Sequence, residues 1–268
     1  MARRRNWIIQ SWCMMLVATL PAICSYPTGA ADIHIVAAWT FDEGKGDITE
    51  DVSGNGHDGT LMNGAKWSKE GKTGGCIEFD GVESYVEVPH NDSLNLKAFT
   101  IEAWIKVGPK AGNHSIMHKA GPGGNLERNY ILNVLVDNNG ILRASFTANG
   151  AQQNFDGVTG VMDETWHHVA ASYDGDVGRI YVDGELDSEI RMGFELEPND
   201  SPLVIGKAGF QSGRFAGLMD EVCLSNIARP IEDIRELMNR GLSEILNVEA
   251  AGKLTTTWGV VKSTYKQL

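Results

Sequence analysis

Residues 166–187 read WHHVAASYDGDVGRIYVDGELD, and this stretch contains the clearest secondary-structure pattern in the chain. Val, Ala and Tyr alternate with His, Ala and Ser from 168 to 173, which is the period of a half-buried strand. A first strand is expected over 166–173 and a second over 179–182, and Asp183-Gly184 is typical of a hairpin turn that requires positive φ. The stretch therefore predicts three consecutive antiparallel strands.

Short strand-like segments of the same kind extend over most of the chain. Gly, Asn, Asp or Pro residues stand in nearly every gap between them. Many short strands with this spacing favour an all-β fold, an antiparallel β-sandwich or jelly roll. The other strands that we expect are residues 35–41, 59–62, 76–79, 85–88, 99–107, 115–118, 130–136, 142–148, 203–205 and 215–224.

One short C-terminal helix is expected after Pro230, where a proline is tolerated at the beginning of a helix. Apolar residues at 231, 234, 237 and 238 follow the spacing of a single helix face. Acidic residues at the beginning and Arg240 at the end suit the helix dipole, and Gly241 is a natural stop. We expect this helix to pack on the sandwich.

The chain divides into three parts. Residues 1–31 combine three arginines, an apolar run over 7–23 and small residues near the end, which is the pattern of a signal peptide. The run is too short and too interrupted for a membrane span, so none is expected in the mature chain, although an uncleaved anchor is the alternative. One domain over 35–241 and a polar tail over 242–268 follow. The sequence leaves three interpretations of the tail: a strand, a docking segment or disorder. The expected location is secreted, periplasmic or in the cell envelope.

Charge and cysteine content exclude some classes of protein. The 268 residues carry a formal charge of -12, and no basic cluster follows the N-terminus, so nucleic acid is not an expected partner. Cys76 and Cys223 remain after removal of the signal peptide. They are open to two interpretations, a disulfide in an oxidising compartment or two separate buried thiols.

Seven segments in a fixed order point to one family. They are AAWTFDEGKG (37–46), DVSGNGHDGTL (51–61), IEFDGVESYVEVP (77–89), FTIEAWIKV (99–107), WHHVAASYDG (166–175), IYVDGELD (180–187) and FAGLMDEVCLSNIARPIEDI (215–234). They resemble a laminin-G-like domain of the concanavalin A-like lectin/glucanase superfamily, in its bacterial, pentraxin-like branch. The resemblance covers about 35–241 and implies two antiparallel sheets in a jelly-roll β-sandwich. It does not identify a ligand, because one fold hosts many functions.

Catalysis is not expected. The glucanases of this superfamily carry a Glu-x-Asp-x-x-Glu motif on one strand, and that spacing is absent here. The acidic pairs Asp42-Glu43 and Asp220-Glu221 are adjacent, and adjacent residues of a regular strand point to opposite faces. The same rule argues against metal chelation by His167-His168. An atypical glycoside hydrolase is kept as an alternative.

Calcium is the expected cofactor, in a structural role. Asp51 and Asn55 lie on a glycine-rich loop that offers the oxygen ligands calcium prefers. Similar domains often bind calcium, and the resemblance adds Asp42 and Asp220 as further ligands. The alternative for the loop residues is ordinary turn chemistry.

Ligand contacts are expected on loops at the rim of the sandwich. Lys119 and Arg128 begin and end a polar loop, and Tyr130, Phe155 and Phe210 lie in or beside loops that could offer an aromatic platform. The alternatives are a solvated loop and rings that serve packing. The sequence thus indicates a secreted, non-catalytic module that binds a carbohydrate or an extracellular protein. A structural or adhesive envelope protein is the alternative, and the oligomeric state stays open.

Overall fold

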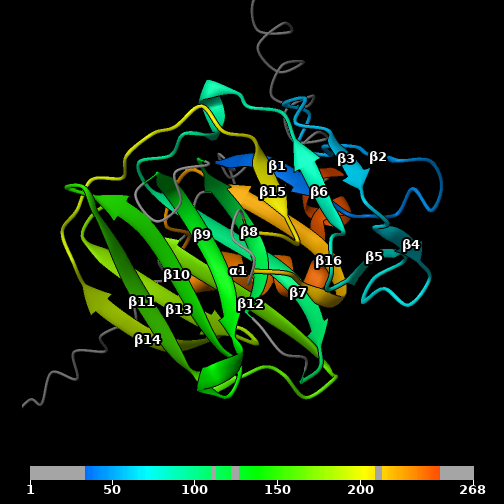
Figure 1. Ribbon diagram of the computed structural model, residues 1–268. Coiled ribbons are helices and arrows are strands. Elements are labelled where there is room, and N and C mark those ends of the chain that lie inside the picture. Colours follow the sequence, from blue (N-terminus) through cyan, green and yellow to red (C-terminus); the bar gives the residue numbers. More distant parts are fainter. Residues whose placement is uncertain (1–33, 110–112, 122–126, 209–212, 248–268) are drawn as a thin grey trace, which may run out of the picture.

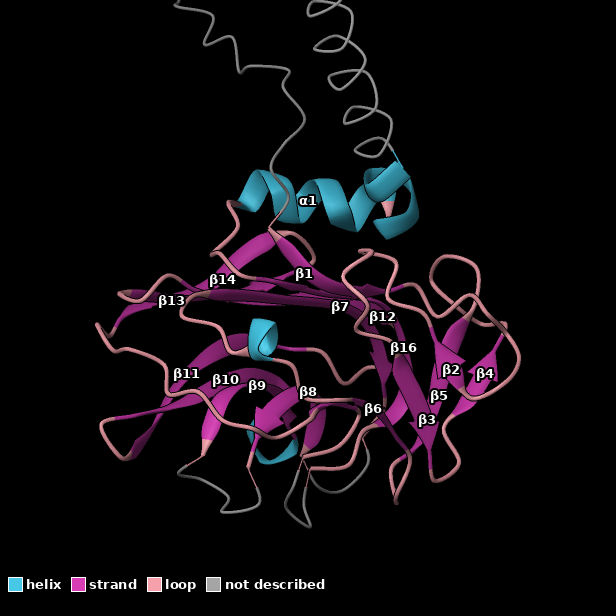
Figure 2. Cartoon of the chain, turned by 90° about the horizontal axis from the view of Figure 1, so that it is seen from above, coloured by secondary structure: helices cyan, strands magenta, loops and turns pink. Residues whose placement is uncertain are grey.

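The computed structural model describes residues 34–109, 113–121, 127–208 and 213–247. Its strands form two antiparallel sheets that pack face to face, with the hydrophobic core between them (Figure 1). Helix α1 (Ile231–Arg240) lies on the outer face of one sheet (Figure 2). The expected all-β sandwich with one short C-terminal helix is confirmed. The signal-peptide prediction and Phe210 lie outside the described residues.

Sheet A is the sheet that carries α1. Its strand order is β14 (Glu185–Arg191), β13 (Val177–Val182), β12 (Trp166–Tyr173), β7 (Phe99–Val107), β16 (Ala216–Ser225), β5 (Cys76–Asp80) and β4 (Lys66–Ser68), and β1 (Ile35–Trp39) also pairs with β16.

Sheet B is the opposite layer. Its order is β11 (Ala151–Gly160), β10 (Ile141–Ala148), β9 (Arg128–Leu135), β8 (His114–Ala120), β15 (Leu203–Ile205), β6 (Tyr85–Val88), β3 (Gly59–Met62) and β2 (Ile48–Thr49). Short 3₁₀ turns follow β6 (Asp92–Leu94) and β9 (Val136–Asn138).

Three strands were not expected from the sequence. β2 and β4 are two and three residues long, and β11 is a polar edge strand. Strand prediction depends on a hydrophobic alternation, which a strand with one solvated edge and few buried side chains does not need. Five expected strands (β3, β6, β7, β12 and β15) have the predicted ends.

The Asp183-Gly184 turn has the predicted geometry, with φ of 51° and 75°. It joins β13 to β14, as a hairpin turn of this type should. Asp183 also accepts a hydrogen bond from the backbone of His168 at 2.9 Å and bonds the ring of His167 at 2.8 Å. His168 itself is fully buried, so the two adjacent histidines have different environments and do not form a chelating pair.

Aromatic rings fill the centre of the core. The Tyr173 ring lies 4.7 Å from Phe146, 6.2 Å from Phe99 and 6.4 Å from Phe155, measured between centroids. Phe99 also lies 5.8 Å from Tyr130. These rings come from both sheets, so they tie the two layers together at distances where aromatic pairs attract each other.

Strand β16 contains a bulge that organises sheet A. Asp220 is opposite Trp104 and Cys223 is opposite Glu102, so β16 has one more residue than β7 in this interval. The extra residue accounts for the positive φ of Glu221, 51°. Before the bulge β16 pairs with β5, and after it with β1, so these two strands lie end to end along the same edge.

Helix α1 covers a polar network on the outer face of sheet A. Arg229 donates to the fully buried Glu102 at 3.0 Å, and His168 Nε2 lies 3.8 Å from the same carboxylate. Burial raises the pKa of Glu102 to about 7 and lowers the pKa of His168 to about 3. Around this network Ile234 and Leu237 pack on the sheet.

The first residues of the C-terminal tail continue this packing. Residues 242–247 are helical, and Leu242 and Ile245 are buried against Ile35, Ala38 and Cys223. This part of the tail is therefore a docking segment, one of the three possibilities that the sequence left open. Residues 248–268 lie outside the described part of the chain.

The two cysteines of the described residues are free and buried. Cys76 lies on β5 and Cys223 on β16 beyond the bulge. Of the two interpretations that the sequence allowed, separate buried thiols is the one observed. Burial raises the pKa of the Cys76 thiol to about 11 and that of Cys223 further.

The open edges of the two sheets meet at β11 and β14. Asp187 on β14 accepts hydrogen bonds from the backbone of Val158 at 2.6 Å and from the hydroxyl of Thr159 at 2.5 Å. Ser188 donates to the carbonyl of Asp156 at 2.6 Å. Side chains of sheet A thus satisfy backbone groups of the edge strand of sheet B, which closes this side of the sandwich.

The buried ion pair leads to a stability prediction. Arg229→Met removes the cation beside Glu102 and should cost about 3–5 kcal/mol of unfolding free energy, because a buried carboxylate loses its partner. Arg179→Met breaks an exposed ion pair with Asp174 and Glu189, and should cost less than about 1 kcal/mol. Urea denaturation at pH 8 measures both, and equal losses would contradict the role of the buried pair.

Candidate functional site

The outer face of sheet B presents a polar row of side chains. Paired residues across neighbouring strands form the row in the order Thr60, Glu87, Val204, His118, Ile131, Ser145 and Asn154. Paired residues in antiparallel strands point to the same face, and most of the residues that flank them in sequence belong to the core. The row therefore faces away from the core. Helix α1 packs on the other sheet (Figure 2).

Several polar atoms of this face are buried without a hydrogen-bond partner among the described residues. They are His118 Nδ1, Ser145 Oγ, Ser115 Oγ, Asn133 Oδ1 and Arg214 Nη1. Buried polar groups in folded proteins are nearly always bonded, so a cluster of exceptions needs an explanation. Each unsatisfied group costs about 1–3 kcal/mol, which a ligand or ordered water would recover. We call His118, Ser115, Asn133, Ser145, Lys207 and Arg214 the polar face.

His118 is the central titratable group of the polar face. The ring is 4% exposed, and burial lowers its pKa to about 4. The positive charges of Arg128 and Lys207 act in the same direction, and a hydrogen bond with the Lys207 backbone opposes them. The ring is therefore neutral at physiological pH.

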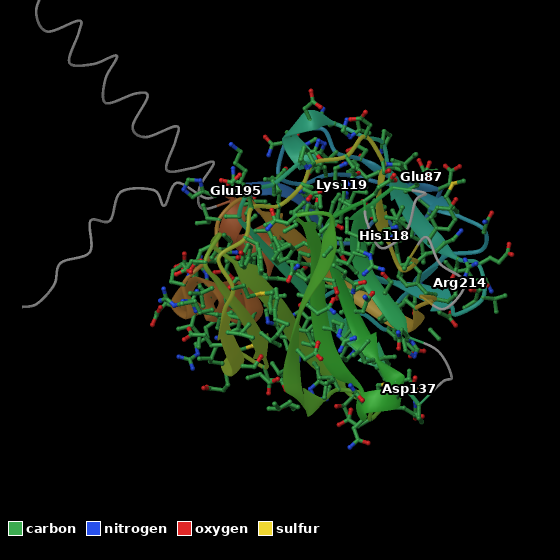
Figure 3. The ribbon with its side chains drawn as sticks, turned by 60° about the vertical axis from the view of Figure 1, so that its left-hand side comes forward. Glu87, His118, Lys119, Asp137, Glu195 and Arg214 are labelled. Atoms are coloured by element: carbon green, nitrogen blue, oxygen red, sulfur yellow. The ribbon has the colours of Figure 1, made fainter. Side chains whose placement is uncertain are left out.

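Lys207, whose backbone bonds the His118 ring, and Arg214 are two half-buried cations of the polar face. Lys207 and Arg214 pair in an isolated β-bridge, and Lys207 Nζ lies 4.2 Å above the centroid of the Tyr85 ring. Figure 3 shows Glu87, His118 and Arg214 in the same part of the molecule. The sequence analysis did not single out Tyr85, Lys207 or Arg214. The alternation of Tyr85 and Glu87 with the core residues Val86 and Val88 was the available signal for Tyr85.

Lys119 does not lie on a solvated loop as expected. It belongs to β8 and is fully buried, with Nζ donating to the carbonyl of Ser201 at 2.8 Å and that of Asn199 at 2.9 Å. Burial lowers its pKa to about 8. Strand β8 continues to Ala120, two residues beyond its expected end, and this extension carries Lys119 into the structure.

The predicted aromatic platform is also wrong for two of its three rings. Tyr130 is fully buried on β9, where its hydroxyl donates to the carbonyl of Leu94 at 3.1 Å, and Phe155 is 3% exposed within the core. Neither ring presents a face to solvent. Arg128 lies at the beginning of β9 close to His118, and is 8% exposed. Phe210 is outside the described residues.

Two of the four predicted metal ligands instead organise a turn. Asp51 accepts hydrogen bonds from the backbone of Ala38, Ser53 and His57, each at 3.0 Å. The Asn55 amide donates to the carbonyl of Val36 at 3.0 Å. Both side chains therefore hold the 51–57 loop against β1, as in the turn-chemistry alternative, and the two Asp51 oxygens and the Asn55 amide nitrogen already have protein partners.

The other two, Asp42 and Asp220, meet beside the bulge of β16. One glycine-rich loop bonds both carboxylates: Thr73 N donates to Asp220 at 2.9 Å and Gly75 N to Asp42 at 2.6 Å. At Gly74, with φ of 69°, a side chain would lie 2.2 Å from the Asp42 carboxylate, so only glycine allows this approach.

A third carboxylate, Glu221, joins this group. Burial raises the pKa of Asp220 and of Glu221 to about 7, and the charge of Asp42 adds to both shifts. The expectation that Asp220 and Glu221 point to opposite faces fails because Glu221 is the extra residue of the bulge. Glu221 accepts a hydrogen bond from Leu242 N at 2.5 Å.

The side chains available as ligands limit the kind of metal site that fits here. Among the described residues, no group of three or more His, Cys, Asp or Glu side chains is arranged to hold a metal ion. Asp42 and Asp220 fit a calcium site only if backbone carbonyls or water complete the coordination, which calcium accepts. The Asp51 oxygens already accept three backbone hydrogen bonds, and the Asn55 amide nitrogen donates to β1, so the proposed calcium site is limited to Asp42 and Asp220.

A separate groove of about 610 Å³ lies where β1 meets the turn after β6. Its lining includes the polar side chains of Asn55, His57, Asn91, Ser93 and Asn226. His57 Nε2 lies 2.9 Å from Ser93 Oγ, and Ser93 donates to Asn91 at 2.9 Å, so these side chains are bonded to one another. Asp220 and Glu221 do not line this groove.

Comparison with known proteins places the chain in a family. The family model of the concanavalin A-like lectin/glucanases superfamily, laminin-G type, matches residues 80–235, which is more than half of the chain. The chain belongs to this superfamily. The match runs from the end of β5 to the middle of α1, and so includes most of both sheets of this laminin-G-like domain.

Solved structures share the fold at low sequence identity. The binding domain of Paraclostridial Mosquitocidal Protein 1 has a TM-score of 0.62 and 17% identity over 76% of this chain and 52% of that chain. Domain 4 of AbnA, an extracellular arabinanase from Geobacillus stearothermophilus in complex with arabinotriose, has a TM-score of 0.59 and 18% identity. The alignment covers 76% of this chain and 97% of that domain. The botulinum neurotoxin serotype D ligand binding domain in complex with N-acetylneuraminic acid has a TM-score of 0.61 and 13% identity. The alignment covers 79% of this chain and 52% of that chain.

The laminin-G-like domain spans about half the length of the two toxin domains and nearly all of the arabinanase domain. At these identities the likeness shows the fold alone. No curated protein sequence matches the chain. Within the described residues, no helix has the length and apolar character needed to cross a membrane.

The depressed pKa of His118 predicts a pH dependence of stability. Between its ordinary value of 6.5 and about 4, the unfolded chain binds a proton that the folded ring does not, so stability falls as pH falls through this window. In His118→Gln, the loss of unfolding free energy between pH 7 and pH 4 should be smaller by on the order of 3 kcal/mol. Chemical denaturation at pH 7 and pH 4 measures it, with the exposed His34→Gln as control. An unchanged pH dependence in His118→Gln would refute the assignment.

Proposed function

We propose that this laminin-G-like domain is a non-catalytic module that binds a glycan on the outer face of sheet B. The observation that carries the proposal is the cluster of buried polar atoms without partners on that face. Hydroxyl, imidazole, amide and guanidinium groups there offer both donors and acceptors, which is the chemistry that sugar hydroxyls require. An extracellular protein is the other partner class.

The fold neighbours support a binding role. Three of them are a binding domain, a domain in complex with arabinotriose and a ligand-binding domain in complex with N-acetylneuraminic acid. Those ligands belong to those proteins, and the low identity does not transfer them. They make a glycan a reasonable first class to test.

A non-enzymatic role is favoured over hydrolysis by the environment of the acidic residues. Glycosidases need two carboxyl groups that flank a substrate bond. Asp220 and Glu221 are buried, and backbone N–H groups of Thr73 and Leu242 bond them. An atypical hydrolase remains the alternative, and release of reducing sugar from a bound glycan would favour it.

We also propose that the protein is exported and that a structural calcium ion binds beside Asp42 and Asp220. Export is supported by the signal-peptide pattern of residues 1–31. Calcium is supported by two carboxylates that share one glycine-rich loop, next to the charge of Glu221, which a cation would offset. Calcium bound there would hold the loop against the bulge.

A glycan array of the purified protein, with calcium and with chelator, tests the proposed function. We expect binding to a defined sugar class, and we expect Ser145→Val to weaken it because the hydroxyl of Ser145 lies on the polar face. Thr60→Val, at the far end of the same row, is the matched control. A folded protein that binds no glycan in either condition would shift the function to a protein partner or an envelope role.

Calcium binding has its own measurement. Addition of calcium at about 100 times its dissociation constant should stabilise the protein by about 2.7 kcal/mol, which is a rise in melting temperature of about 5–10 °C. Asp42→Asn should abolish the rise, because it removes an exposed ligand without disturbing the core. Asp137→Asn, an exposed change on the 136–138 turn, should retain it. No thermal shift and no heat of binding would exclude the calcium proposal.

A further inference from the structure

Two cations stand side by side on the polar face. Lys207 and Arg214 are antiparallel bridge partners, so their side chains leave the backbone on the same side. The position of Lys207 Nζ over the Tyr85 ring places that side chain on the outer face of sheet B. Arg214 Nη1 is buried and has no hydrogen-bond partner among the described residues.

Neither cation has an acidic partner in the described part of the chain. The arginine ion pairs there join Arg143, Arg179, Arg191, Arg229, Arg235 and Arg240 to carboxylates, and leave Lys207 and Arg214 out. Glu87 is on the same face, yet it forms no ion pair with them. The protein has 35 acidic and 23 basic residues. Two adjacent unpaired cations in such an acidic chain therefore point to an external anion.

His118 adds a hydrogen-bond acceptor beside the two cations. The ring bonds the backbone of Lys207, and this bond favours the protonated form, as expected where a ring N–H donates to a carbonyl. The other nitrogen of the neutral ring, Nδ1, is then an acceptor, and it lacks a donor. A carboxylate alone cannot supply that donor, whereas a hydroxyl can.

We propose that Lys207, Arg214 and His118 bind an acidic sugar, whose carboxylate contacts the two cations and whose hydroxyl donates to His118 Nδ1. A uronic acid and a sialic acid unit each combine these two groups. This inference rests on the proposed glycan-binding function and specifies its ligand class. Tyr85 positions Lys207 through the cation–π contact, which holds the ammonium group at the site.

Two matched pairs of probes test the role of the carboxylate with the full-length protein. The first pair is trigalacturonic acid and its methyl ester, and the second is 3′-sialyllactose and lactose. Isothermal titration should give at least about tenfold tighter binding of the acidic member of one pair, the usual effect of a charge-assisted hydrogen bond. Sodium sulfate, titrated alone, measures binding of an anion that has no sugar hydroxyls.

Substitutions on the polar face identify the groups responsible. Lys207→Gln and Arg214→Gln should each weaken binding of the acidic probe about tenfold and bring it close to that of the neutral probe. Arg240→Gln on α1 makes the same charge change on the opposite sheet and should bind as the unaltered protein does. Circular dichroism of each variant checks that it is folded.

Three results would overturn the inference. One is equal affinity within both probe pairs, and another is an acid preference that persists in both Gln variants. The third is sulfate binding as tight as that of the acidic sugar, which would reduce the site to a general anion site. A neutral glycan bound on the array would leave the proposed function intact in each case, and absence of any glycan binding would refute that function itself.

Discussion

The bulge in β16 is the constraint on which the arrangement of sheet A depends. One extra residue, Glu221, separates a segment paired with β5 from a segment paired with β1, while β7 stays paired along the other edge. The end of β1 and the beginning of β5 therefore meet beside the bulge, and the chain brings Asp42 and the 73–75 loop to the same place. A local deviation in one strand thus brings together the carboxylates of Asp42, Asp220 and Glu221, although Asp42 is far from the other two in sequence.

The two outer faces of the sandwich differ in what covers them. On sheet A, α1 and residues 242–247 bury the Glu102–Arg229 pair, so the charges compensate each other inside the protein. Buried polar atoms without hydrogen-bond partners occur on both faces among the described residues, at His168, Ser172 and Ser225 of sheet A and on the polar face of sheet B. The faces differ in that helix α1 covers the outer face of sheet A (Figure 2), which is why we assign the scaffold to that face and recognition to the other.

Much of the fold was predictable because β-sandwich strands alternate in polarity, and β6, β7 and β12 have the expected ends. β11 was missed because an edge strand with few buried residues lacks that signal. Site residues were harder. Lys119 was assigned to a loop and Tyr130 to the first position of a strand beside it, while register and sheet pairing place both side chains inside. Asp42 and Asp220 lie beside the same loop, as the resemblance implied. Lys207 and Arg214 belong to no sequence motif, and only the β-bridge between them shows that they are neighbours.

The free thiols have a consequence for the conditions in which the fold persists. Cys76 and Cys223 are sealed from solvent with raised pKa values, so they stay protonated and are poor nucleophiles. The described part of the chain contains no cross-link that a reductant could open. Its folding therefore needs neither an oxidant nor a disulfide isomerase, and its stability is independent of the redox potential of the surroundings.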